Sequence, residues 1–244
     1  KASFYLYRTE DANSEFPIEE QNWAVGAERA DSLGVDVYSV SLGYSTFDDP
    51  ALNYSYNNMD GNTTMIAKAA DLAAKKGILV VVSAGNEGTS SWHYLLTPSD
   101  ADSVLAVGAV DSLGNVAGFS SYGPSSDNRV KPNVASVGWM TAVANFNTGM
   151  PTFGSGTSFA CPNMAGLSTC LWQAFPDVNN MSIIDALQQS ATRATNPDNR
   201  VGYGIPDVKK AFALLVKKSF HAQVQLTDCV VTGEMQIKTG NNIN

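Results

Sequence analysis

A pattern of helix, glycine and strand occurs twice in the first third of this chain and limits the folds open to it. Residues 23–33 carry apolar side chains at helical spacing, and residues 35–40 follow as a strand. Residues 64–76 and the aliphatic run 78–82 repeat the plan. A glycine separates helix from strand each time, as expected where a helix ends in the left-handed conformation. The aliphatic run is typical of a strand that is covered on both faces.

Alternating helices and strands predict an open α/β fold. We expect a mostly parallel sheet with right-handed crossovers, flanked by helices on both faces in three layers. Further strands are predicted at 104–110 and 116–120, and further helices at 158–175, 181–192 and 207–217.

Composition excludes several classes of protein. Hydrophobic residues make up 44% of the 244 residues and charged residues 16%, which is incompatible with a disordered chain. The net charge of −8 disfavours binding to nucleic acid. The aliphatic run 78–82 is far shorter than the roughly 20 residues of a membrane-spanning helix. Three cysteines, two of them in one predicted helix, do not indicate a disulfide framework.

The chain divides into two regions of different character. Residues 1–217 carry the helices and strands and form the predicted domain, and residues 218–244 form a C-terminal extension. Short alternating stretches around Gly233 fit a β-hairpin in that extension. Residue 1 is a lysine and no signal segment precedes the first elements, so we expect a processed piece of a longer protein.

Glycine-rich polar segments follow two of the predicted strands. Ser41-Leu42-Gly43 follows the first strand and Ser83–Gly88 follows the aliphatic run. Ligands of open α/β sheets bind beyond the carboxyl ends of the strands. Both segments are therefore candidates to line a cleft.

The stretch 153–162 provides a mount for a nucleophile. Its glycines allow a sharp turn, and a helix is predicted to begin at about Ser158, with Pro162 in its first turn. A hydroxyl at a helix N-terminus lies in a positive field that favours developing negative charge. The ordinary alternative is that Ser158 only caps the helix.

Asn86 lies directly beyond the aliphatic strand and favours the interpretation of Ser158 as a nucleophile over that of a helix cap. A side-chain amide directed into the same cleft can donate a hydrogen bond to an oxyanion formed from an acyl carbonyl. The alternative is that Asn86 is a turn residue beside its glycines.

The segment Gly156–Pro162 closely resembles the nucleophile signature of the subtilisin-like serine proteases, the subtilases. The resemblance extends over about residues 1–217, and six short pieces in one shared order are not expected by chance. The other matching pieces are 41–43, 84–88, 106–110, 119–124 and 131–134.

The resemblance implies a subtilisin-like fold and a serine endopeptidase that acts on polypeptides through an acyl-enzyme. Ser158 would be the nucleophile, and Asn86 with the Ser158 backbone N–H would form the oxyanion hole. Residues 41–43 would pair with an extended substrate peptide. Ser83, Ala84 and Gly85 would line one wall of the pocket for the residue before the scissile bond, and their small size suits a large apolar side chain there.

The family's catalytic aspartate and histidine have no counterpart in this sequence. The only histidines, His93 and His221, lie at positions that do not match, and we interpret both as ordinary surface or turn residues. We expect the aspartate and histidine in an N-terminal segment upstream of Lys1, and little activity from the chain alone. A pseudoprotease that binds peptides without cleaving them is the main alternative.

Other implications of the resemblance concern ions, location and packing. The reaction requires no cofactor. Structural calcium is an option in the loop 48–62, although the acidic residues of this loop have no fixed ligand spacing. We interpret Asp48-Asp49 and Asp60-Gly61 as loop residues. The family implies a secreted or cell-envelope protein. A phosphate site at residues 154–156 is a further alternative, but it lacks a nearby basic residue. Two departures, Asn133 and Asn163, and the filler Cys161 are expected to affect packing.

Overall fold

The structure, a computed structural model, describes residues 2–220. Its centre is a parallel sheet in the order β1-β2-β3-β4, in which chain order and spatial order coincide. The strands are β1 (Val37–Val40), β2 (Leu79–Ser83), β3 (Leu105–Val110) and β4 (Val134–Val137). The two central strands are buried along their whole length.

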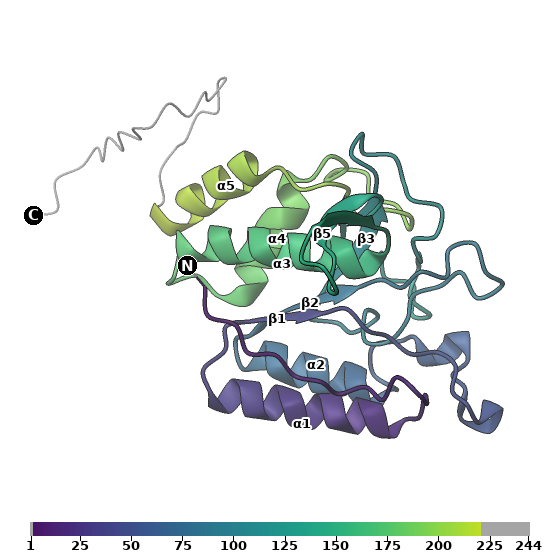
Figure 1. Ribbon diagram of the computed structural model, residues 1–244. Helices are drawn as coiled ribbons and strands as arrows, with labels where there is room; N and C mark the ends of the chain where they lie inside the picture. Colours follow the sequence, from purple (N-terminus) through teal and green to yellow (C-terminus); the bar gives the residue numbers. More distant parts are fainter. Residues whose placement is uncertain (1, 221–244) are drawn as a thin grey trace, which may run out of the picture.

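Helices cover both faces of this sheet, so the predicted three-layer α/β architecture is confirmed (Figure 1). Two helices lie on one face, and a longer helix crosses all four strands on the other, with two more helices behind it. The first pair is α1 (Ile18–Ser32) and α2 (Met65–Lys75), and the second layer is α3 (Thr157–Gln173), α4 (Asn180–Ser190) and α5 (Val208–Phe220).

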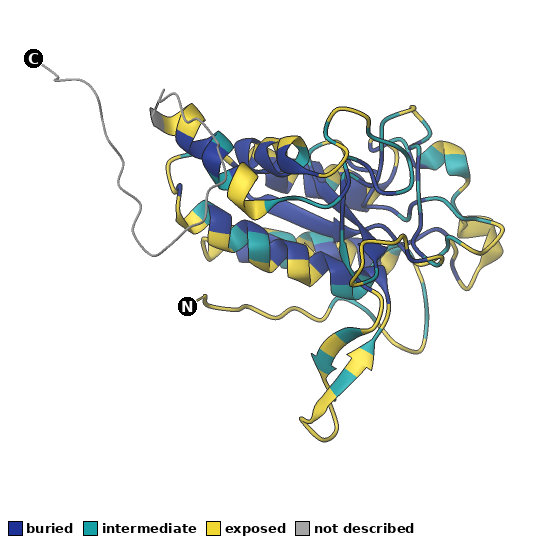
Figure 2. Ribbon diagram, turned by 90° about the horizontal axis from the view of Figure 1, so that it is seen from above, coloured by how far each residue is buried: buried dark blue, intermediate teal, exposed yellow. Residues whose placement is uncertain are grey.

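The residues of the sheet and of the helices that face it are largely buried (Figure 2). Two main apolar clusters fill the space on the two faces of the sheet. The odd-numbered residues of β2, Leu79 and Val81, face α3, whereas Val80 and Val82 face α1 and α2. Every side chain of this strand therefore needs an apolar partner, which explains its unbroken aliphatic run. Gly77 ends the preceding helix with φ +102°, as predicted.

The first helix begins at Ile18, five residues before the predicted start at Trp23. Glu19 and Glu20 occupy its first turn and are buried. Glu20 accepts hydrogen bonds from the Tyr54 hydroxyl and the Ile66 N–H. These tertiary partners are not visible in an apolar periodicity, so the prediction missed the first turn.

The strand predicted at 116–120 is wrong. Only a single bridge joins Val116 to Val110, and the segment turns back across β3. The reason is topological, because β2 and β4 already occupy both edges of β3. The sequence analysis also missed β4 and an antiparallel hairpin of β5 (Thr141–Ala144) and β6 (Pro151–Gly154), which projects from the body in Figure 2.

The last helix, α5, runs to Phe220, and the predicted hairpin around Gly233 lies outside the described residues. The division at residue 217 stays a prediction. Within residues 2–220, no helix is long and apolar enough to cross a membrane.

Candidate active site

Ser158 is the second residue of α3, not its cap. Gly156 occupies the capping position with φ +157° and ψ +155°, and Thr157 opens the helix. The hydroxyl of Ser158 is half-buried and makes one long contact, 3.5 Å from the carbonyl oxygen of Ser41. The interpretation of Ser158 as a capping residue is therefore wrong, because no side chain caps this helix.

Pro162 lies in the second turn of α3, one turn later than predicted. A proline has no N–H, so it cannot bond to the carbonyl four residues earlier, which is that of Ser158. The Ser41 hydroxyl donates to this free carbonyl oxygen at 3.0 Å. The carboxyl end of β1 is thereby tied to the residue that carries the candidate nucleophile.

Asn86 is held against the start of the same helix. Its Oδ1 accepts hydrogen bonds from the Thr157 N–H at 2.8 Å and the Thr157 hydroxyl at 3.1 Å. Thr157 Oγ1 in turn accepts from the Gly85 N–H at 3.2 Å. Because a backbone N–H can only donate, these contacts orient the amide of Asn86 with its oxygen toward α3.

Two hydrogen-bond donors are left free by this arrangement. Neither Asn86 Nδ2 nor the Ser158 N–H has a partner among residues 2–220. Thr157 holds both, since it adjoins Ser158 and binds Asn86. Sequence analysis missed this role of Thr157; its signal was a buried hydroxyl beside the serine, which needs a partner.

The predicted substrate edge also has free backbone groups. Leu42 and Gly43 make no backbone hydrogen bond within the described part of the chain, whereas Tyr44 pairs with Thr97 in both directions. A Cβ at Gly43 would lie 2.8 Å from Leu96 Cβ, so the edge runs close to the loop beyond β2. Free N–H and C=O groups in an extended segment are suited to pair with a peptide.

Ser83, Ala84 and Gly85 are buried at the end of β2. Both backbone groups of Ala84 are bonded, to Val107 and Leu96. Gly85 has φ +108°, and a Cβ there would meet Leu96 and Ser121 at 2.8 Å. The lining of a substrate pocket by these three residues stays a prediction.

His93 is occupied elsewhere in the fold. Its ring packs between Tyr94 and Tyr122, with centroids 4.0 and 5.1 Å away, and makes no hydrogen bond to Ser158. His221 lies outside the described residues. Within residues 2–220, no histidine or carboxylate bonds to the Ser158 hydroxyl.

The residues expected to serve packing have such contacts. Cys161 is fully buried beside the carbonyls of Val40 and Val81, and burial raises the pKa of its thiol to about 11. Asn133 Oδ1 accepts from the Ala106 N–H, which joins β4 to β3. Asn163 donates to the carbonyl of Val137.

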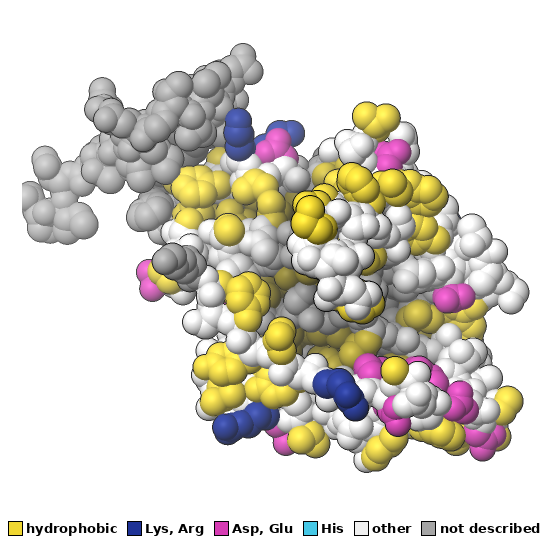
Figure 3. All heavy atoms as spheres, viewed as in Figure 1, with side chains coloured by type: hydrophobic (Ala, Val, Ile, Leu, Met, Phe, Trp, Pro, Cys, Tyr) yellow, Lys and Arg dark blue, Asp and Glu magenta, His cyan; other side chains and the backbone are white. Residues whose placement is uncertain are grey.

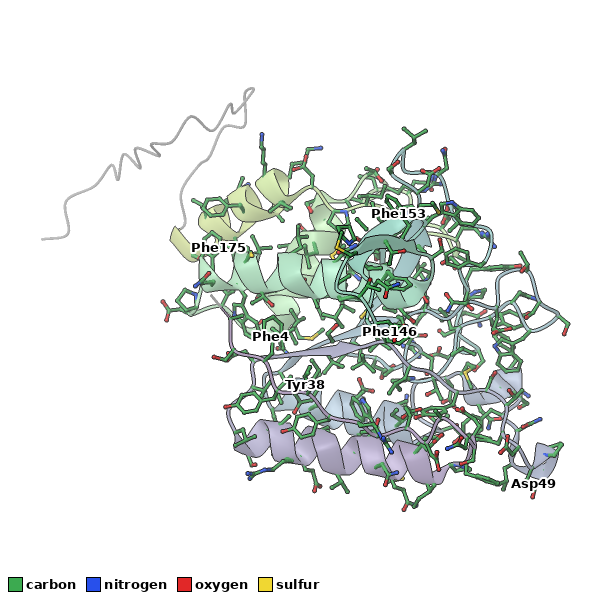
Figure 4. All side chains as sticks on the ribbon, viewed as in Figure 1. Phe4, Tyr38, Asp49, Phe146, Phe153 and Phe175 are labelled. Carbon is green, nitrogen blue, oxygen red and sulfur yellow. The ribbon has the colours of Figure 1, made fainter. Side chains whose placement is uncertain are left out.

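The acidic side chains of the loop 48–62 serve mainly local turns. Asp49 caps a short 3-10 helix, η1 (Pro50–Leu52), and Asp60 accepts from the N–H groups of Asn62 and Thr63. Asp49 lies at the tip of this loop in Figure 4. Bound calcium in this loop stays a prediction.

The sequence of this chain is similar to those of known proteases. The profile of the Subtilase family matches residues 1–204. The chain is 34% identical over 175 residues to Thermophilic serine proteinase of Bacillus sp. (strain AK1), and 33% identical over 168 residues to Subtilisin DY of Bacillus licheniformis. These alignments cover 72% and 68% of this chain but 37% and 53% of the relatives.

Solved structures show the same relationship. The self-cleaved protease domain of PatA has a TM-score of 0.64 and 27% identity, covering 80% of this chain and 68% of that one. MycP1 from the ESX-1 type VII secretion system, at 23% identity and a TM-score of 0.62, shares the fold over 85% of this chain and 60% of its own. The chain belongs to the subtilase family of peptidases.

Proposed function

We propose that the protein containing this chain is a serine endopeptidase whose acyl-enzyme forms on Ser158. The Ser158 oxygen would attack a peptide carbonyl while a base takes its proton, and the amine leaves with a proton returned by that base. Water would then hydrolyse the ester. Family membership and the order of the matching segments support this assignment.

One observation carries the mechanism: the pair of free donors beside Ser158. The Ser158 N–H and Asn86 Nδ2 are both held by Thr157 and have no partner in residues 2–220. Donors fixed in advance around a developing oxyanion need no rearrangement during the reaction. Asn86 is exposed, so a substrate carbonyl can reach it.

The base would come from outside the described residues. Ser158 Oγ faces only a carbonyl oxygen, which can accept its proton in a hydrogen bond but cannot remove it. The outer edge of β1 adjoins a cavity of about 440 Å³, lined by residues 5–10 on one side and 37–42 on the other. An additional strand from an N-terminal segment of the same protein would fit this place and bring the base close to Ser41. The isolated chain is then a poor catalyst.

The substrate would be a polypeptide in extended form. The free backbone groups of Leu42 and Gly43 favour pairing with a peptide strand. Secretion or attachment to the cell envelope completes the proposal and rests on the family alone.

Labelling with a fluorophosphonate probe tests the assignment. In the full protein we expect intact mass to increase by one probe and peptide mapping to place it on Ser158, with Ser158→Ala unlabelled. Residues 1–244 alone should label far more slowly, because no base activates the hydroxyl. A label on any other residue would contradict the assignment.

The second candidate is a pseudoprotease that binds peptides. The single carbonyl contact of the Ser158 hydroxyl favours it. If the full protein binds an extended peptide but neither labels nor cleaves, this alternative replaces the enzyme.

A further inference from the structure

Three glutamates meet where the N-terminal segment turns into α1. Glu10 ends the extended segment, Glu15 lies in the following loop, and Glu19 belongs to the first turn of the helix. One carboxylate oxygen of each lies within 4.8 Å of the others. Figure 3 shows acidic side chains gathered in this region, over the N-terminal end of α1.

Burial distinguishes this group from an ordinary acidic surface. Glu19 is only 2% exposed. One of its oxygens accepts the Asp11 N–H at 2.7 Å, while Oε2 is buried and has no partner among residues 2–220. A buried carboxylate oxygen without a partner is costly, because it has lost its water and gained nothing in exchange.

Positive charge does not offset the group within the described residues. None of the three glutamates forms an ion pair with a lysine, arginine or histidine there. Burial raises the pKa of Glu15, and the charges of Glu19, Glu10 and Asp48 raise it further. Repulsion of this kind is sustained in proteins where a cation occupies the centre.

The surroundings hold the three side chains in place. The Tyr44 hydroxyl donates to Glu10 Oε1 at 2.7 Å. Asp48 accepts from the Glu15 N–H at 3.3 Å and donates its own N–H to the Glu15 carbonyl at 3.0 Å. The site therefore has a fixed frame in which one buried carboxylate oxygen, on Glu19, has no partner among residues 2–220.

The ligand set determines which cation fits. All the groups are oxygens, which hard cations prefer. The three oxygens lie within 4.8 Å of one another, which is compatible with one shared ion about 2.3–2.6 Å from each, the distance of Ca²⁺ ligands. Mg²⁺ keeps several of its waters and is rarely held by carboxylates of the protein alone, so this ligand set favours Ca²⁺.

We propose that Glu10, Glu15 and Glu19 form a calcium site that joins the N-terminal segment to α1. Its three ligands lie outside the loop 48–62, although Asp48 at the start of that loop bonds to the Glu15 backbone. Through Tyr44, which directly follows Gly43, it would also steady the proposed substrate edge.

The test measures ion binding on the full protein after removal of metal by a chelator. We expect CaCl₂ to raise the melting temperature in a saturable way. Tb³⁺ should show luminescence sensitised by Tyr44 that Ca²⁺ displaces. Glu15→Gln should weaken both responses at least tenfold. Glu28→Gln, on the exposed face of the same helix, is the matched control and should leave both unchanged.

Glu19→Gln is a second variant, at the buried position. If Glu19→Gln fails to fold, Glu15→Gln still tests the site. Equal calcium responses in the native protein and in Glu15→Gln would overturn the proposal, even if another calcium site exists. The proposal would also be overturned if the native protein showed no calcium response and Glu15→Gln, in chelator, melted at a higher temperature than the native protein. An equal shift with Mg²⁺ at the same concentration would overturn the choice of calcium.

Discussion

The two edges of the central sheet differ in how they are covered. At β4 the segment after α4 returns along the strand, where the Ala135 N–H donates to the Gly204 carbonyl and the Tyr203 N–H donates to that of Asn133. At β1 the described residues pair only with β2, and the opposite side faces the cavity of about 440 Å³. The chain therefore closes one edge itself and leaves the other open.

Edge strands with free N–H and C=O groups invite pairing, and proteins usually cover them. Asn86, Thr157 and the candidate nucleophile lie together beyond the carboxyl ends of β2 and β1. The open side is where the proposed mechanism still needs a base. On the proposed function, one additional strand beside β1 would complete both the edge of the sheet and the site.

The largest expected effect separates the isolated chain from the full protein. We expect kcat/KM for a chromogenic peptide to be about 10⁶-fold lower for residues 1–244, the order of loss known when a subtilisin loses its nucleophile or histidine. Ser158→Ala in the full protein should fall to the same level. Cleavage by the isolated chain at a rate close to that of the full protein would break the comparison.

The next effect concerns the proposed oxyanion hole alone, without the missing base. Asn86→Asp keeps an oxygen for Thr157 but removes the Nδ2 donor, so we expect kcat of the full protein to fall about 10²–10³-fold with little change in KM, the loss seen when a subtilisin loses one such donor. Asn163→Ala removes an amide that bonds to Val137 and is the control. Equal losses in both variants would show that the effect is one of packing.

Glycine substitutions compare the two edges directly. Gly202 has φ +62°, and a Cβ there would lie 2.0 Å from the Pro132 carbonyl oxygen, so Gly202→Ala should lower the free energy of unfolding by about 2–4 kcal/mol. Gly26 lies inside α1 beside the open edge, where a Cβ finds its nearest neighbour, on Thr9, at 3.5 Å. Gly26→Ala should raise the free energy of unfolding by about 0.5–1 kcal/mol.

Urea denaturation of both variants measures this contrast. We expect the free energy of unfolding to fall in Gly202→Ala and to rise in Gly26→Ala. If both variants destabilise the protein to the same extent, the open edge is packed as tightly as the closed one.

The smallest effect depends on pH. Lys131, before β4, is buried with its Nζ bonded to the Ala101 carbonyl, and burial lowers the pKa of this amine to about 8. Between this value and its ordinary pKa the unfolded chain binds more protons, so the free energy of unfolding should rise with pH. We expect a gain of about 1 kcal/mol from pH 8 to pH 9.

The difference between the native protein and Lys131→Met in urea denaturation at the two pH values isolates this term. The gain should vanish in the variant. If the native protein instead lost stability relative to Lys131→Met from pH 8 to pH 9, the result would contradict the burial of the Lys131 amine.

The parts of the fold that were predictable are those with local signals. The strand 79–83 was predicted within one residue, because burial on both faces demands aliphatic side chains throughout. The segment 116–120 contains Val116 and Phe119 but also a glycine and a serine. It has no free strand to pair with, which only the sheet order shows. The hairpin of β5 and β6 was missed because its apolar residues, including Phe146 and Phe153, are largely exposed (Figure 4).

The candidate site divides in the same way. Ser158 and Asn86 were found through short segments that resemble a family, and the structure brings both to Thr157. Two roles could not be predicted in this way: Thr157 bonds to Asn86, and Ser41 bonds to the Ser158 carbonyl. Both depend on contacts between residues more than 70 positions apart. The glutamate cluster is spread over a turn without regular spacing, so no period in the sequence could indicate it.

Pro162 has a consequence beyond its own helix. By withholding one amide hydrogen, it turns the second carbonyl of α3 outward to the hydroxyl of Ser41. Two hydrogen bonds thus join the end of β1 to the candidate nucleophile, one from each serine hydroxyl to the carbonyl of the other serine. On the proposed function, a strand that docked on β1 and shifted Ser41 would shift the Ser158 backbone with it, so that assembly of the sheet and alignment of the nucleophile would be one event.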